Sequence, residues 1–177
     1  MTDYERCLDL DRAVAFEHYV RNEAKVTRTC FISAPAQGLV YQIKSTKPFS
    51  IFIHCDGAFI REKDYKENHF TLTGICPGRS GLKVIKENKP EEFLFPEEPE
   101  LQGVHFIGEG CVTAEGGSAA VSADGILLEH VTGVEIRMAI RTSFRGFDKA
   151  YTSQYSDTEI RHMLADDLEK LSKPFEE

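Results

Sequence analysis

The chain has 177 residues, of which 41% are hydrophobic and 28% charged, and its formal net charge at pH 7 is −8. These proportions are those of a globular protein with one sizeable core. Acidic residues outnumber Lys and Arg by 29 to 21, which argues against a nucleic-acid partner because phosphate recognition needs a clustered positive field. No apolar run approaches the roughly 20 residues that span a bilayer, and the first residues have no signal-peptide pattern. We therefore expect a cytoplasmic protein without a membrane partner.

The first third of the chain predicts a β-meander. Met1–Leu10 is a polar lead-in, and Ala13–Val20 alternates apolar and polar side chains, which is typical of a strand. Arg21–Ala24 is expected to form a hairpin turn. Val26–Cys55 then predicts three strands, separated by two turns that contain proline. These turns are expected at Ala34–Gly38 and Thr46–Pro48.

The middle of the chain is less regular. Phe59–Asn68 is charged and lacks a clear period, so we expect a surface loop there. His69–Ile75 predicts a short strand. Arg79–Leu101 is dominated by Pro, Glu and Lys, cannot bury much apolar surface, and predicts a long, mobile acidic loop.

Strand patterns return after this loop, with Asp124-Gly125 as a hairpin signal between two of them. The expected strands are Gly103–Ile107, Cys111–Ala114, Ala119–Ser122, Ile126–His130 and Val134–Thr142. The last of these alternates most cleanly. Its apolar side chains share one face, which predicts a central strand with that face buried.

The end of the chain predicts a helix. Ser156 and Glu159 have the spacing of a capping box, and apolar residues follow at helical spacing over Thr158–Ser172. The predicted fold is therefore all-β, an antiparallel β-sandwich of super-sandwich or jelly-roll type with one C-terminal α-helix. We expect a β-sandwich domain over residues 1–147, and over 148–177 a linker and helix that lead towards a further domain.

Candidate catalytic residues do not form a set. The cysteines are odd in number, widely spaced and without zinc spacing, which favours reduced, structural thiols. No histidine lies four residues from another, so no helical metal pair exists, and we expect neither a metal nor another cofactor. Glycines near Gly108 and Gly116 lie among strands and not before a helix, which argues against nucleotide binding. Ser143 lacks the surrounding glycines of a nucleophile elbow, and nothing near Cys111 indicates a base.

Several phrases of the sequence carry more information than its spacing. They are Tyr4-x-Arg6-x-Leu8-Asp9-Leu10-Asp11-x-Ala13-Val14-Ala15, Thr27-Arg28-x-x-Phe31-x-Ser33-x-Pro35 and, much later, Thr142-Ser143-Phe144. In these phrases the sequence resembles the N-terminal β-sandwich domain of glycoside hydrolase family 95. The strongest matches lie in the first 35 residues, and Thr142-Ser143-Phe144 resembles the end of that domain's final strand.

This resemblance implies a parent enzyme of the α-L-fucosidase or α-galactosidase type. In that family the catalytic carboxylate lies in an (α/α)6 barrel, which would follow Glu177, so no catalytic residue is carried onto this chain. The implied partners are that barrel and, through it, a glycan. Family members have opening strands ahead of Tyr4 that are missing here, so an unpaired sheet edge is expected to allow a homodimer.

Three functions remain open at this point: a non-catalytic accessory domain of a glycoside hydrolase, a stand-alone carbohydrate-binding module, and a scaffold sandwich. The segment before the helix would lie near a barrel, so its polar and aromatic side chains are the candidate substrate-proximal residues, with a plain linker as the alternative. These candidates are Arg141, Ser143, Phe144, Arg145 and Tyr151.

Overall fold

The computed structural model describes residues 1–78, 102–149 and 154–173. Within these ranges the chain forms β-strands followed by one helix, so the all-β class with a single C-terminal helix is confirmed. The elements are β1 (Thr2–Asp9), β2 (Val14–Arg21), β3 (Ala24–Ser33), β4 (Gly38–Ile53), β5 (Ile60–Lys66), β6 (His69–Ile75), β7 (His105–Glu115), β8 (Ser118–Ser122), β9 (Gly125–Thr142) and α2 (Asp157–Leu171). The predicted loop at 79–101 lies outside the described residues.

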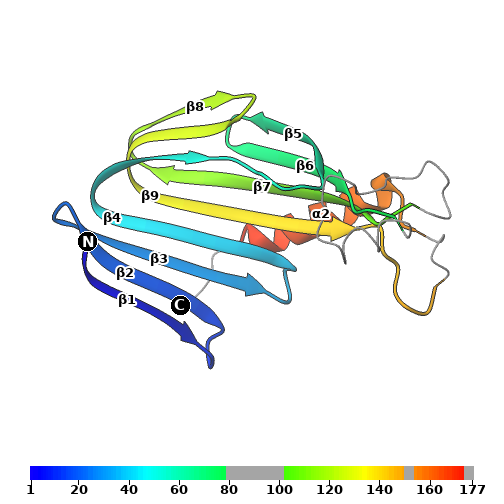
Figure 1. The fold of residues 1–177 in the computed structure, drawn as a ribbon, viewed down its shortest axis with the longest axis horizontal. Helices are drawn as coiled ribbons and strands as arrows, with labels where there is room; N and C mark the ends of the chain where they lie inside the picture. The colour runs from blue at the N-terminus through cyan, green and yellow to red at the C-terminus, as the bar shows by residue number, and fades with distance from the viewer. Residues whose placement is uncertain (79–101, 150–153, 174–177) are drawn as a thin grey trace, which may run out of the picture.

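All nine strands belong to one antiparallel sheet in the order β1-β2-β3-β4-β9-β7-β6-β5, with β8 paired to β9 (Figure 1). The 18-residue β9 is its central strand. It pairs with β4 along one side, and along the other with β8 near its start and β7 near its end. The two halves of the sheet, β1–β4 and β5–β7, are therefore joined only through β9 among the described residues.

The sheet curls over at one end and encloses a first core. Ile126 and Leu128 of β9 lie in the same buried cluster as Tyr65 of β5 and Phe70 of β6, although β7 separates β9 from these two strands in the sheet order. The Tyr65 hydroxyl accepts a hydrogen bond of 2.6 Å from the backbone N–H of Cys55, which follows β4. This curl gives the two-layered region of the predicted sandwich.

Helix α2 covers the opposite face of the sheet and forms a second core. Ile160, Leu164 and Leu171 are at most 1% exposed. They pack against apolar side chains of three strands, which are Val40, Ile107 and Ala139. The apolar stripe of the predicted helix therefore has its partner on the sheet itself.

The capping box at the start of α2 is confirmed. The Ser156 hydroxyl accepts from the Glu159 backbone N–H, and the Glu159 carboxylate accepts from the Ser156 backbone N–H at 2.8 Å. These reciprocal bonds satisfy donors that no helical carbonyl can reach. The helix begins at Asp157 and ends at Leu171, one residue earlier at each end than predicted.

Two segments expected to be irregular are strands. Met1–Leu10, predicted to be a lead-in, contains β1, which pairs with β2. Phe59–Asn68, predicted to be a loop, contains β5, which pairs with β6. Both are outer strands of the sheet, and in β5 only Tyr65 is buried. An outer strand needs few apolar residues, so its period-two signal is weak.

Three predicted breaks are absent. The turn at Thr46–Pro48 is a bend inside β4, marked by register shifts between Lys44 and Phe49 in the pairing with β9. Pro48 lacks a backbone N–H, so the pairing is interrupted without ending the strand. The gaps expected after Ile107 and after His130 lie within β7 and β9, which run through them.

The prediction that β9 buries only its apolar face is wrong. Ile140 on that face is 48% exposed, whereas Ala139 on the other face is 1% exposed. The helix covers the face that carries Ala139, Arg137 and Arg141, because the arginines find partners on α2.

The second core predicts a measurable role for Leu164. Leu164→Ala should lower the free energy of unfolding by about 2–5 kcal/mol, because the side chain is fully buried between α2 and the sheet. Urea unfolding followed by circular dichroism measures this. His162→Ala, on the exposed side of the same helix, is the matched control and should change it by less than about 0.5 kcal/mol. Equal effects of the two substitutions would contradict the packing.

Candidate functional site

A cleft opens where β4 separates from β3. The two strands pair up to Ser45, opposite Val26. Beyond that point β4 bends away with β9 while the β2–β3 hairpin continues to its turn. The Thr46 hydroxyl accepts from the backbone N–H of Lys25 at 3.0 Å, so a side chain takes over from the backbone where the strands part.

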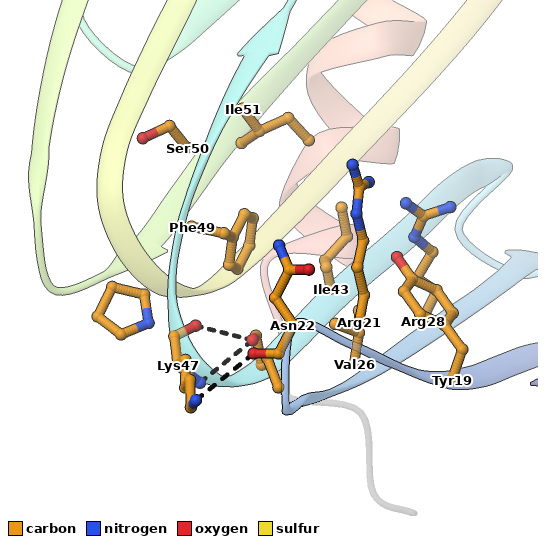
Figure 2. A pocket seen from close by; sticks show the side chains of 13 residues that line it. Tyr19, Arg21, Asn22, Val26, Arg28, Ile43, Lys47, Phe49, Ser50 and Ile51 are labelled. Carbon is orange, nitrogen blue, oxygen red and sulfur yellow. Dashed lines mark hydrogen bonds between the residues drawn. The ribbon is translucent and has the colours of Figure 1, made fainter. Parts of the chain in front are cut away.

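The lining of this cleft combines an apolar wall with cations (Figure 2). Its volume is about 480 Å³, within the range of small-molecule sites. The lining residues are Tyr19, Arg21, Asn22, Ala24, Val26, Arg28, Ile43, Ser45, Lys47, Pro48, Phe49, Ser50 and Ile51. They include three cations and, among the described residues, no carboxylate.

The three cations differ in how far they are neutralised. Lys47 donates to the Glu23 carboxylate at 2.8 Å. Arg28 lies 3.4 Å from the Glu17 carboxylate and 5.5 Å from the ring centre of Tyr19. Arg21 forms no ion pair within the described part of the chain. Arg21 is thus the cation of the cleft whose charge is least neutralised, and Arg28 follows with one long ion pair.

Arg28 carries an unusual polar atom. Its Nε is buried and has no hydrogen-bond partner among the described residues, although the side chain is 39% exposed. A buried donor without a partner costs free energy. Nearby, burial raises the pKa of Tyr41, and Arg28 partly opposes that rise. The Tyr41 hydroxyl is therefore neutral at physiological pH.

Sequence reasoning missed this cleft, although one signal was available. In a hairpin with the two-residue turn Asn22-Glu23, Arg21 faces Ala24, and Glu17 faces Arg28. Since paired residues and alternate residues share a face, Arg21 and Arg28 were predictable on the same face of this hairpin.

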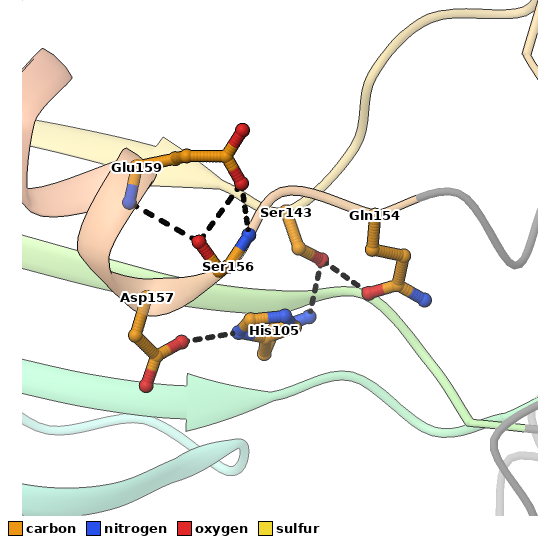
Figure 3. Close-up of polar contacts among 6 residues, drawn as sticks. All are labelled: His105, Ser143, Gln154, Ser156, Asp157 and Glu159. Atoms are coloured by element: carbon orange, nitrogen blue, oxygen red, sulfur yellow. Dashed lines mark hydrogen bonds and ion pairs between the residues drawn. The ribbon is translucent and has the colours of Figure 1, made fainter.

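A second polar cluster lies at the start of α2 and contains a Ser, a His and an Asp (Figure 3). His105 Nδ1 is 3.0 Å from the Asp157 carboxylate. The Ser143 hydroxyl, however, accepts from the backbone N–H of His105 at 3.1 Å and donates to Gln154 at 2.6 Å. A nucleophilic serine must be hydrogen-bonded to the imidazole itself. Ser143 is also fully buried, so this cluster fixes the chain before the helix and is not a catalytic triad.

Of the other predicted substrate-proximal residues, two bind α2. Arg141 makes a bidentate pair with Asp167 at 2.6 and 2.9 Å, and this bond holds the pKa of Arg141 above its ordinary value. Arg145 bonds Glu159 at 3.2 Å and lies over the ring of Tyr155. The geometry thus gives both arginines contacts that hold the helix.

Phe144 is 43% exposed and meets the exposed ring of Phe147 edge-on. Tyr151 lies outside the described residues. The four described members of the set are thus divided among contacts to α2, the hydrogen bonds of Ser143 and an exposed aromatic pair.

Thiol and metal chemistry find no support in the described residues. All five cysteines are free and partly buried, and burial raises the pKa of Cys30, Cys76 and Cys111, which disfavours the reactive thiolate. Among described side chains no group of three His, Cys, Asp or Glu residues could hold a metal ion. No helix in the described ranges has the length and apolarity to cross a membrane.

The described residues form a β domain, which is a curled antiparallel sheet backed by one helix. The family match identifies the class of domain. Residues 1–147 match the family "Glycosyl hydrolase family 65, N-terminal domain", and the chain belongs to that family. No curated protein matches it. The expected kind of domain is thus confirmed, but family 95 is corrected to family 65.

A solved structure supports the fold. It is named "Putative kojibiose phosphorylase from human microbiome" and superposes with a TM-score of 0.57 at 11% sequence identity. The alignment covers 96% of this chain and 22% of that chain. This chain therefore spans about a fifth of the solved protein.

The Arg141–Asp167 pair yields a prediction for stability. Arg141→Met leaves the carboxylate of Asp167, which is 1% exposed, without its bidentate partner. We expect the free energy of unfolding to fall by about 3–5 kcal/mol. The double variant Arg141→Met/Asp167→Leu removes both charges and should cost less than Arg141→Met alone. Urea unfolding of the variants tests this. A double variant with a lower free energy of unfolding than Arg141→Met would contradict it.

The capping box yields a pH dependence. The backbone and side-chain hydrogen bonds from Ser156 hold the pKa of Glu159 below its ordinary value. A carboxyl group whose pKa is lower in the folded state stabilises the folded state at pH values above its unfolded-state pKa of about 4.3. This stabilisation is lost as the pH falls through the lower folded-state pKa. Glu159→Gln should therefore reduce helix stability at pH 7 but have a smaller effect at pH 3. Circular dichroism during urea unfolding at both pH values tests this, and equal effects would contradict it.

Proposed function

We propose that this chain is a non-catalytic β domain that packs against the catalytic domain of a family 65 type enzyme. That parent enzyme would act on glycosidic bonds between sugars, by hydrolysis or by phosphorolysis as the name of the solved relative indicates. The observation that carries the proposal is the match of residues 1–147 to the family's N-terminal domain. The fold supports it, because 96% of this chain superposes on only 22% of the larger solved chain.

Exposed apolar side chains indicate the docking surface. Strands β1, β3 and β9 end at the same end of the sheet, because neighbouring strands are antiparallel. Six of the nine described large apolar residues that are at least 43% exposed lie at this end or directly after it. They are Leu8, Leu10, Ile32, Ile140, Phe144 and Phe147. Patches of this kind mark protein contacts.

A hollow beside Ile140 strengthens this assignment. It has a volume of about 420 Å³ and is walled mainly by apolar side chains. Its lining includes Phe59, Ile60, Leu72, Phe106, Met138 and Ile140. An apolar side chain of a catalytic domain would fit such a hollow, and burying it would remove water from both surfaces.

Two expectations about partners stay predictions. The homodimer was predicted from missing opening strands that would leave a sheet edge unpaired. In the structure the outer strand on that side of the sheet is β1. A register shift between Thr2 and Glu5 distorts that edge, and such bulges oppose edge-to-edge pairing. Glycan binding by the isolated domain also stays a prediction, as does the fucosidase or galactosidase specificity of a parent enzyme.

The proposal predicts inactivity alone and binding in trans. The purified chain should neither hydrolyse nor phosphorolyse kojibiose, maltose or trehalose, measured as released glucose or glucose 1-phosphate. It should bind the separately expressed catalytic domain from its own reading frame. Ile32→Glu should weaken that binding by about tenfold, because it places a charge in the apolar contact.

Val121→Glu is the matched control, because Val121 is 41% exposed on β8 at the other end of the sheet. It should leave the binding unchanged. Turnover by the chain alone, or a reading frame that encodes no catalytic domain, would overturn the proposal. Equal loss of binding in both variants would overturn the assigned surface.

A further inference from the structure

We propose that the cleft between the β2–β3 hairpin and the bend of β4 binds a small carbohydrate that carries one anionic group, a phosphate or a carboxylate. This inference rests on the cleft alone and does not depend on the catalytic partner proposed above. Nothing in the family match assigns a ligand to this surface. The argument has three parts: charge, shape and the unsatisfied arginine.

The charge of the lining favours an anion. Arg21, Arg28 and Lys47 line the cleft, while the carboxylates of Glu17 and Glu23 contact two of these cations from outside the lining. Arg21 remains without an ion pair among the described residues. This positive lining stands out in a chain of net charge −8. Arginine is suited to phosphate and carboxylate because its planar fork donates two parallel hydrogen bonds.

The shape of the cleft favours an amphipathic ligand. Figure 2 shows the Arg21 and Arg28 side chains extending in the same direction from the hairpin, with the Phe49 ring across from them. Below the guanidinium groups, Val26 and Ile43 form an apolar floor between the strands. A sugar ring has an apolar C–H face that packs on aromatic and aliphatic side chains, and hydroxyls that pair with polar ones. Asn22 and Ser50 offer such polar groups at the rim.

The unsatisfied Nε of Arg28 explains why a ligand would stabilise this arrangement. The guanidinium holds one weak ion pair of 3.4 Å, and its Nε donor is buried without a partner. A ligand oxygen that draws the guanidinium towards the cleft would add charge-assisted hydrogen bonds to an incompletely satisfied side chain. The free energy that the unpaired donor costs would then be recovered on binding.

The test is a titration of the whole chain with defined probes, followed by the amide chemical shifts of residues 19–28 and 43–51 in NMR spectra. The probes are glucose 1-phosphate, glucuronate, glucose and inorganic phosphate. We expect saturable binding of at least one of the two anionic sugars, tighter by about tenfold than binding of glucose or phosphate. The affinity should fall as the salt concentration rises, because salt screens the partly exposed ion pairs between the anionic sugar and the arginines. The anionic sugar that binds with the higher affinity shows whether the cleft prefers a phosphate or a carboxylate.

Two variants and a matched control locate the binding. Arg28→Gln and Arg21→Gln should each weaken binding of the anionic sugar by about tenfold. Lys44→Gln is the control, because Lys44 lies on the same strand as Ile43 but points to the opposite face. It should change the affinity by less than about twofold. Arg21→Gln lies at the exposed hairpin end, so it keeps the test valid even if Arg28→Gln unfolds the chain.

Each contrary result has a definite meaning. Equal binding of inorganic phosphate would overturn the carbohydrate part, and equal binding of glucose would overturn the anionic part. Loss of binding in Lys44→Gln to the same degree as in Arg21→Gln would overturn the location. Absence of binding for both anionic sugars would overturn the proposal as a whole and would leave the proposed accessory role untouched.

Discussion

The fold depends on how a charged face of the central strand is covered. Arg137 and Arg141 lie on the same face of β9 as the buried Ala139, and α2 lies across them. Arg141 binds the buried carboxylate of Asp167 through two hydrogen bonds, and Arg137 donates to the carbonyl oxygen of Leu171 at the end of the helix. Because the Asp167 side chain is 1% exposed, a shift of the helix would leave its buried carboxylate unpaired.

This constraint changes the meaning of the segment before α2. Ser143, His105 and Gln154 bind one another so that the chain leaves β9 and enters the helix at a fixed point. Arg145 then reaches forward to Glu159 of the capping box. Arg141, Ser143 and Arg145, whose types suggested substrate contact, therefore have structural partners. The ligand site that we propose is instead the cleft at the β2–β3 hairpin.

Local signals in the sequence predicted local structure well. The capping box was predictable because its two residues lie three positions apart in the sequence. The strand Val134–Thr142 was predictable because its apolar side chains recur at every second residue. The strand β5 was not, since five of its seven residues are charged and only Tyr65 reaches the core. The bend at Pro48 looked like a turn because proline interrupts pairing, and only the distant partner β9 shows that β4 continues. The cleft is formed by that same bend. It could not be predicted either, because the bend is recognised only from the pairing of β4 with β9.

The position of β9 also has a consequence for how the chain folds. The strands β4 and β7 find their shared partner only when residues 125–142 are available, because no other described strand joins the two halves of the sheet. Until then each half presents an unpaired edge, and the contacts that close the sheet span long stretches of sequence. Such topologies fold slowly and expose sites for aggregation. During synthesis, the last strand of the sheet is thus the one that protects the strands made before it.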